Sequence, residues 1–231
     1  MRFAIVVFPG SNCDTDCYHV ARELLGCEAE YIWHKDRDLK GADVVVLPGG
    51  FAYGDYLRAG ALARFSPVME SVAEFARSGG PVLGICNGFQ VLLEAELLPG
   101  AVRVNSGLRY VCRDVYLKVE NNQTPFTSLY ERGSVVPMPI GHMEGNYTAP
   151  PETLEELRKE GLVVFRYCDS EGRVLDAANP NGAADSIAGI SNRQGNVVGL
   201  MPHPDRCAEE LLGNAAGRRM FESVVHALAV R

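Results

Sequence analysis

Little in this sequence favours binding to a nucleic acid or to a membrane. The formal net charge is −7, from 22 basic and 29 acidic residues. There is therefore no basic surface of the kind that binds phosphate backbones, and no polybasic segment for an anionic membrane. The apolar opening MRFAIVVF is too short for the apolar part of a secretory signal or for a membrane span. With no export signal, we expect a cytoplasmic protein with neither a nucleic-acid nor a membrane partner.

The sequence also lacks the cysteine patterns of disulfide frameworks and zinc sites. Its seven cysteines are scattered, and only Cys13 and Cys17 lie close together, so no second pair completes a zinc-ribbon pattern. We expect thiols that act mostly as small hydrophobic side chains, and no metal site. Neither a G-x-x-x-x-G-K-[ST] loop nor a G-x-G-x-x-G motif after a strand is present, which argues against nucleotide binding by this chain.

The order of apolar and amphipathic segments predicts an α/β protein. Strands are predicted at residues 3–8, 30–33, 44–47, 82–85, 102–119, 134–140, 162–167, 187–191 and 197–201. Helices are predicted at residues 16–25, 62–77, 150–161 and 212–230. Because several of the strands are apolar nearly throughout, we expect a mostly parallel central sheet that is covered by helices on both faces. No repeat, low-complexity tract or linker interrupts the pattern, which favours a single domain over residues 1–231.

A cysteine flanked by glycines follows the strand at 82–85. The segment GICNG (84–88) leads from an apolar strand into an apolar helical stretch, as in a nucleophile elbow with cysteine in place of serine. Small flanking residues would allow a strained turn that directs the Cys86 thiol into the cleft above the sheet. The helix N-terminus favours the thiolate, and the N–H of Asn87 would face the oxygen of an attacked carbonyl. The alternative is a buried structural cysteine in a glycine-rich turn.

A nucleophilic cysteine needs a base, and His203 is the best placed of the five histidines. It follows the strand at 197–201 in the segment PHPDR, where a proline on each side stiffens the backbone. Asp205 could orient its imidazole. His142, which we place in a polar loop after a strand, is the rival base. The remaining histidines are expected at the surface or the core edge (His19 and His226) or in solvent (His34).

A second donor for the oxygen of the attacked carbonyl should come from another loop of the sheet. After the strand at 44–47 the chain continues Pro48-Gly49-Gly50. Two glycines allow the backbone to approach a ligand and to turn an N–H toward it, and we assign this role to Gly50. The alternative is an ordinary glycine-rich turn.

Together these motifs resemble the class I (triad-type) glutamine amidotransferases, in which the cysteine of G-x-C-x-G attacks the side-chain amide of glutamine. The resemblance runs nearly end to end, and it is most particular to glutaminase subunits of purine biosynthesis. It rests on FPGSNCD (8–14), PGGFAYGDYLRAGALA (48–63), GICNGFQ (84–90) and NPNGAADSIAGISNRQGNVVGLMPHPDR (179–206). It implies a flavodoxin-like sheet and a catalytic triad of Cys86, His203 and Asp205.

The resemblance also implies a division of labour between subunits. Cys86 would attack L-glutamine, ammonia would leave, and water would hydrolyse the thioester with His203 as base, while Gln90 would contact the substrate. This chain would need no cofactor, since a large synthetase subunit would use ATP and Mg²⁺, and a small third subunit would bridge the complex. The glycine-rich loop 49–60 and the polar loop 142–147 are expected to face these partners.

Two features depart from the family pattern. The carboxylate is Asp205 where Glu is usual, and PIGHMEGNY carries Met143 where the family usually has glycine. Two other interpretations stay open. A cysteine hydrolase or glyoxalase of the intracellular-peptidase type usually has His directly after the nucleophile, where this chain has Asn87. A redox-sensing or partner-binding domain would expose a reactive thiol but would need no PHP histidine.

Overall fold

The chain folds around a nine-stranded mixed sheet. We describe residues 1–230 of a computed structural model. Along the sheet the strands are β2 (Glu28–Trp33), β1 (Arg2–Val7), β3 (Val44–Leu47), β4 (Val82–Ile85), β11 (Val197–Leu200), β10 (Ile187–Ser191), β9 (Val163–Cys168), β6 (Val111–Val119) and β7 (Val135–His142). The first five of these are parallel to one another, and the pairs from β11 to β7 are antiparallel. A separate antiparallel pair joins β5 (Ala101–Val104) to β8 (Glu144–Thr148).

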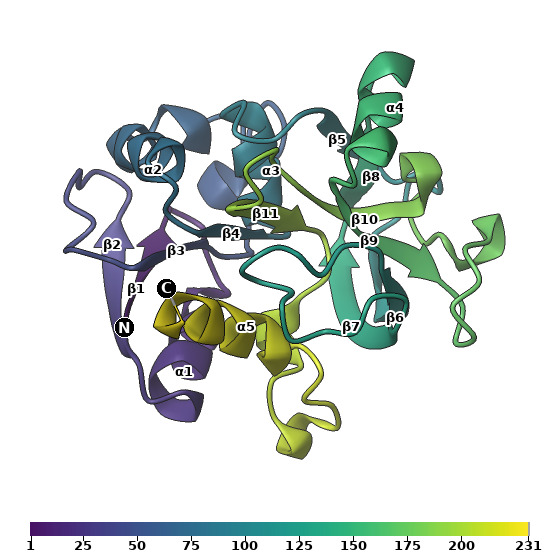
Figure 1. Cartoon of the computed structure of the whole chain (residues 1–231). Helices are drawn as coiled ribbons and strands as arrows, with labels where there is room; N and C mark the ends of the chain where they lie inside the picture. The colour runs from purple at the N-terminus through teal and green to yellow at the C-terminus, as the bar shows by residue number, and fades with distance from the viewer. Residues whose placement is uncertain (231) are drawn as a thin grey trace.

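Helices cover both faces of the parallel half. The helices are α1 (Asp14–His19), which continues as a π-helix (Val20–Leu24), α2 (Pro67–Arg77), α3 (Asn87–Glu94), α4 (Pro151–Lys159) and α5 (Arg218–Ala229). Figure 1 shows α2 and α3 on one side of β3 and β4, with α1 and α5 on the other. Within residues 1–230, no helix has the length and apolarity that crossing a bilayer requires.

The two halves of the sheet differ in how they are buried. Every residue of β3, β4 and β11 is buried, because helices pack on both sides of these strands, and this explains their continuous apolar sequences. In β7, fully buried residues alternate with partly exposed ones, as expected for a strand with one face toward the core. The sheet is thus parallel only from β2 to β11. The alternation of buried and partly exposed residues explains why continuous apolar runs become less common after residue 100.

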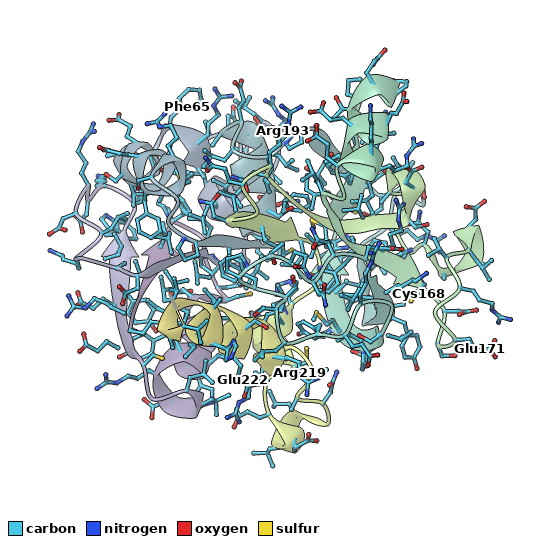
Figure 2. The ribbon with its side chains drawn as sticks, in the orientation of Figure 1. Phe65, Cys168, Glu171, Arg193, Arg219 and Glu222 are labelled. Carbon is cyan, nitrogen blue, oxygen red and sulfur yellow. The ribbon has the colours of Figure 1, made fainter. Side chains whose placement is uncertain are left out.

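The predicted helix over 62–77 is wrong in its first turn. Residues Ala63–Phe65 form a short 3-10 turn, and α2 begins at Pro67. Proline suits the first position of a helix, where no N–H is needed, but it interrupts a helix that is already running. Phe65 therefore lies outside α2 and is 75% exposed, and Figure 2 shows its side chain on the outside of the molecule beside α2.

Two other predicted elements are shorter than expected. The strand predicted over 102–119 is divided into β5 and β6 by a turn, in which Leu108 has a φ of 50°. The amide of Asn105 stabilises this turn by donating to Arg109 O at 2.9 Å. The last helix begins at Arg218 and not at residue 212, because Gly213, with a φ of 89°, ends a preceding 3-10 turn.

Candidate active site

The turn at Cys86 has the strained backbone of a nucleophile elbow. Cys86 has a φ of 49° and a ψ of −105°, a combination that L-residues rarely adopt and that is characteristic of functional sites. The two glycines are required by space, since a Cβ on Gly84 would lie 2.8 Å from the Gly88 backbone, and one on Gly88 would overlap the carbonyl of Leu47. The tight turn places the sulfur at the N-terminus of α3, 3.9 Å from Gly141 O.

His203 and Asp205 lie together at the carboxyl end of β11. The backbone N–H of His203 donates to Pro139 O at 2.9 Å, and its Nδ1 lies 3.3 Å from Asp205 Oδ1. Burial by itself lowers the pKa of His203, but the charges of Asp205 and of a Cys86 thiolate raise it well above its ordinary value. The protonated imidazole is therefore the favoured form of His203 beside these charges.

Cys86 and His203 open into the same cavity, of about 120 Å³. Its walls also include Gly50, Tyr110 and Gly141. The strands β1, β3, β4 and β11 are parallel, so the loops after them meet at one edge of the sheet, where sites of open α/β sheets form. The volume is well below the roughly 300–1,000 Å³ of sites for drug-sized ligands. It suits a small polar group such as a side-chain amide.

Gly50 and Asn87 each offer an unused backbone N–H close to Cys86. Gly50 has a φ of 144°, and a Cβ there would lie 2.8 Å from Asn12 N, so only glycine fits this position. Among residues 1–230, neither the N–H of Gly50 nor that of Asn87 donates a hydrogen bond. Both N–H groups are therefore free within the described residues, and Gly50 lies on the wall of the cavity.

The side chains of Asn87 and Gln90 join the glycine-rich loop to α3. Asn87 Oδ1 accepts from the N–H of Ala52 at 3.0 Å, and its Nδ2 donates to Gln90 Oε1 at 3.0 Å and to Asp55 Oδ1 at 3.3 Å. Gln90 Nε2 donates to Glu144 O at 2.6 Å. Burial, and then the charge of Glu144, raises the pKa of Asp55 to about 6. Gln90 lies one turn along α3 from Cys86. Both ends of its side-chain amide are hydrogen-bonded to protein atoms.

The prediction that His34 is solvated is wrong. Its side chain is buried, and its Nδ1 lies 2.8 Å from the Tyr53 hydroxyl and 3.3 Å from Ser66 Oγ. The glycine-rich loop folds back over the end of β2, so the ring turns inward although charged residues follow it in the sequence. His34 thus helps to hold the loop that carries Gly50.

His142 also lies in a different environment from the one predicted. It is the last residue of β7, and residues 144–148 form β8, so the expected polar loop over 142–147 is a pair of strands instead. Polar residues occur here because β8 pairs only with β5, away from the main sheet. Burial, and then the charge of His203, lowers the pKa of His142 to about 4. Its Nδ1 lies 3.2 Å from Asn105 Oδ1. The ring is neutral at pH 7 and is held inside the protein.

Sequence reasoning missed Cys13, which it treated as one of several hydrophobic thiols. All seven cysteines are free, and all except Cys112 are buried. Cys13, however, lines the cavity and has its sulfur within 4.8 Å of donor atoms of His203 and Asp205. The usable signal was the position of FPGSNC directly after a buried parallel strand, at the edge where functional loops gather.

Comparison with known proteins places this site in a family. The model of the CobB/CobQ-like glutamine amidotransferase domain matches residues 1–226. The chain belongs to this family. The resemblance to glutamine amidotransferases is therefore confirmed, and a free-standing hydrolase or a purely redox-sensing domain is not favoured.

Individual relatives extend the match over the whole chain. The phosphoribosylformylglycinamidine synthase subunit PurQ of Moorella thermoacetica is 56% identical over 225 residues, which cover 97% of this chain and 95% of that protein. The PurQ subunit of Chlorobium luteolum is 55% identical over 228 residues, or 99% of both chains. A chain in the structure of PurLQS from Thermotoga maritima is 41% identical, with a TM-score of 0.86 over 98% of both chains. The predicted fold class, an α/β protein with a mostly parallel central sheet flanked by helices, is thereby confirmed, and the antiparallel pairs from β11 to β7 make the sheet mixed.

Proposed function

We propose that this chain is the glutaminase subunit of a phosphoribosylformylglycinamidine synthase. It hydrolyses L-glutamine and delivers the ammonia to an ATP-dependent synthetase subunit in de novo purine biosynthesis. The observation that carries the glutaminase assignment is the strained Cys86 turn, which opens with His203 into one small cavity. The assignment to this synthase is supported by PurQ relatives that are more than half identical and align with nearly the whole chain.

The first chemical step is attack by the Cys86 thiolate on the side-chain amide carbon of glutamine. The N–H groups of Gly50 and Asn87 stabilise the negative oxygen of the tetrahedral intermediate, and each such donor typically contributes about 10²–10³ in rate. His203 gives its proton to the leaving nitrogen, which departs as ammonia. His203 then takes a proton from water, which attacks the thioester and releases glutamate. Asp205 orients the imidazole and balances its charge.

The predicted contact between Gln90 and the substrate is compatible with the hydrogen bonds that this residue already makes. Its Oε1 accepts from Asn87, and its Nε2 donates to the backbone of Glu144. Each end of the amide keeps one further hydrogen-bonding position, the second N–H of Nε2 and the second lone pair of Oε1, with which Gln90 can bind the substrate.

Partner subunits are expected at the rim of the cavity. Phe51 is 44%, Tyr56 69% and Leu57 75% exposed on the glycine-rich loop, and exposed apolar side chains in one segment are typical of interaction sites. We propose that this rim contacts a large synthetase subunit, which holds ATP and Mg²⁺, with a small third subunit bridging the complex. The similarity to a chain of PurLQS supports this arrangement.

Two further parts of the proposal concern the chain as a whole. We propose that residues 1–231 form one amidotransferase domain, because the main sheet takes strands from both halves of the chain and the family match spans nearly all of it. We also place the protein in the cytoplasm, where its free cysteines would stay reduced.

The assignment is tested in a complex reconstituted with the synthetase and bridging subunits. Formation of formylglycinamidine ribonucleotide is measured with glutamine and, separately, with an ammonium salt as nitrogen donor. The Cys86→Ser variant is expected to lose the glutamine-dependent reaction and to keep the ammonium-dependent one. Full glutamine-dependent synthesis by Cys86→Ser would contradict the nucleophile assignment, and absence of product from both donors would contradict the choice of synthase.

A further inference from the structure

Cys13 forms a buried cluster with the base and its carboxylate that glutamine hydrolysis does not require. One donor atom from each of Cys13, His203 and Asp205 lies within 4.8 Å of the others, and all three side chains are buried. The backbone fixes the position of Cys13, since its N–H donates to Gly49 O at 3.2 Å. The thiol donates to Asn12 Oδ1 at 3.0 Å, which leaves the sulfur lone pairs available.

The other two side chains of the cluster have unused bonding capacity. His203 Nδ1 and Asp205 Oδ1 lie 3.3 Å apart, which is an ion-pair contact. His203 Nδ1 and both carboxylate oxygens of Asp205 are buried without a hydrogen-bond partner in residues 1–230. Buried polar atoms of this kind are uncommon, and a bound ion is one of the partners that accounts for them.

The spacing of His203 Nδ1 and Asp205 Oδ1 matches that of two ligands of one tetrahedral metal ion. Zinc binds nitrogen and oxygen ligands at about 2.0–2.1 Å, so two ligands of one tetrahedral ion lie about 3.3–3.4 Å apart. The observed separation of Nδ1 and Oδ1 is 3.3 Å. A thiolate, an imidazole and a carboxylate are ligands that zinc accepts together, whereas Mg²⁺ and Ca²⁺ prefer oxygen ligands throughout.

We propose that Cys13, His203 and Asp205 bind a Zn²⁺ ion that inhibits the enzyme. Binding displaces the thiol proton of Cys13 and the proton on His203 Nδ1, and both protons pass to solvent. An ion on Nδ1 leaves the remaining ring proton on Nε2, so that nitrogen can no longer accept a proton from Cys86 or from water. Cys13 and His203 both line the cavity, which leads to this site. The inhibition rests on the proposed glutaminase reaction, whereas the binding of the ion does not.

Binding is tested on the full chain with the metal alone. Zn²⁺ affinity is measured by titration calorimetry, and Co²⁺ serves as a spectroscopic probe, because a thiolate ligand gives an intense ultraviolet charge-transfer band. We expect one ion per chain. Cys13→Ser and His203→Ala should each weaken binding at least about tenfold, since loss of even an outer partner of a ligand costs about 10–100-fold.

Matched variants separate this site from the other thiols of the cavity. Cys86 and Cys112 line the same cavity, so Cys86→Ser and Cys112→Ser should keep the affinity and the thiolate band of the wild type. Circular dichroism verifies that each variant is folded, and Cys13→Ala replaces Cys13→Ser if the serine variant is not. Unchanged binding by the folded Cys13 variant, or loss of binding in Cys86→Ser, would overturn the proposed ligand set.

Activity is then measured in the reconstituted complex at increasing Zn²⁺. Glutamine-dependent synthesis should fall with a midpoint near the dissociation constant of Zn²⁺ and should recover when a chelator is added. In Cys13→Ser, inhibition should require at least about ten times more Zn²⁺. Ammonium-dependent synthesis serves as the control for metal effects on the partner. Site-specific binding with unchanged glutamine-dependent synthesis would refute the inhibitory role. A complex without any glutamine-dependent activity would count against the proposed function and leave the binding result intact.

Discussion

Adding one methyl group at Gly49 should disable the base without straining the backbone. Gly49 lies outside the left-handed region, unlike its neighbour Gly50, so alanine is compatible with its backbone conformation. A Cβ there, however, would lie 2.6 Å from His203 Cε1 and 3.1 Å from Cys13 Sγ, whereas ordinary contacts begin at 3.4 Å. The new methyl group and the buried imidazole must therefore separate by about 0.8 Å or more.

The size of the effect follows from the position of the reacting groups. A misplacement of about 1 Å can cost about 10²-fold in rate, which corresponds to about 2.7 kcal/mol in the activation free energy. We therefore expect Gly49→Ala to lower kcat for glutamine hydrolysis in the assembled complex about 100-fold. The loss of folding stability, measured from the melting temperature, should be smaller than about 2.7 kcal/mol. Ammonium-dependent synthesis should be unchanged.

The control is Gly107→Ala, since a Cβ at Gly107 meets no atom within 4 Å and its φ is not in the left-handed region. This variant should have the kcat of the wild type. A Gly49→Ala enzyme with nearly normal kcat would refute the reasoning, because it would mean that His203 can move without loss of activity or is not the base.

Three further predictions follow from the geometry of the site. Cys86→Ala should abolish glutamine hydrolysis without unfolding the chain. A glutamine-like electrophile should modify Cys86, as detected by mass spectrometry, and equal modification of Cys13 would contradict the assignment of Cys86 as the nucleophile. His203→Ala should lower kcat by several orders of magnitude, whereas His142→Ala should mainly lower the melting temperature, because that ring is buried and neutral; the reverse order in steady-state assays would make His142 the base. The pKa of Asp55 is raised from 3.8 to about 6 in the folded chain, so its charge destabilises the folded state above about pH 6. Asp55→Asn should therefore raise the free energy of unfolding, measured by urea titration, relative to wild type above about pH 6. This gain should disappear as the pH falls toward 4. A gain that is independent of pH would show that the charge of Asp55 is not its cause.

The sequence by itself determined the parallel half of the fold and the two central motifs. The strands β3, β4 and β11 are buried on both faces, so their apolar runs identify them without knowledge of their neighbours. The elbow at Cys86 needs glycines within two residues on either side, and the turn at His203 needs its adjacent prolines. All of these are local requirements, because they depend on the backbone freedom of one short segment.

Only the tertiary structure decided which side chains meet. The burial of His34 depends on the glycine-rich loop folding over the end of β2, and the burial of His142 depends on the strand pairing around it. Cys13 comes beside His203 because the loop after β1 and the loop after β11 reach the same edge of the sheet. Such neighbours follow from the order of strands in the sheet, and that order is set by packing between distant segments, which no local pattern records.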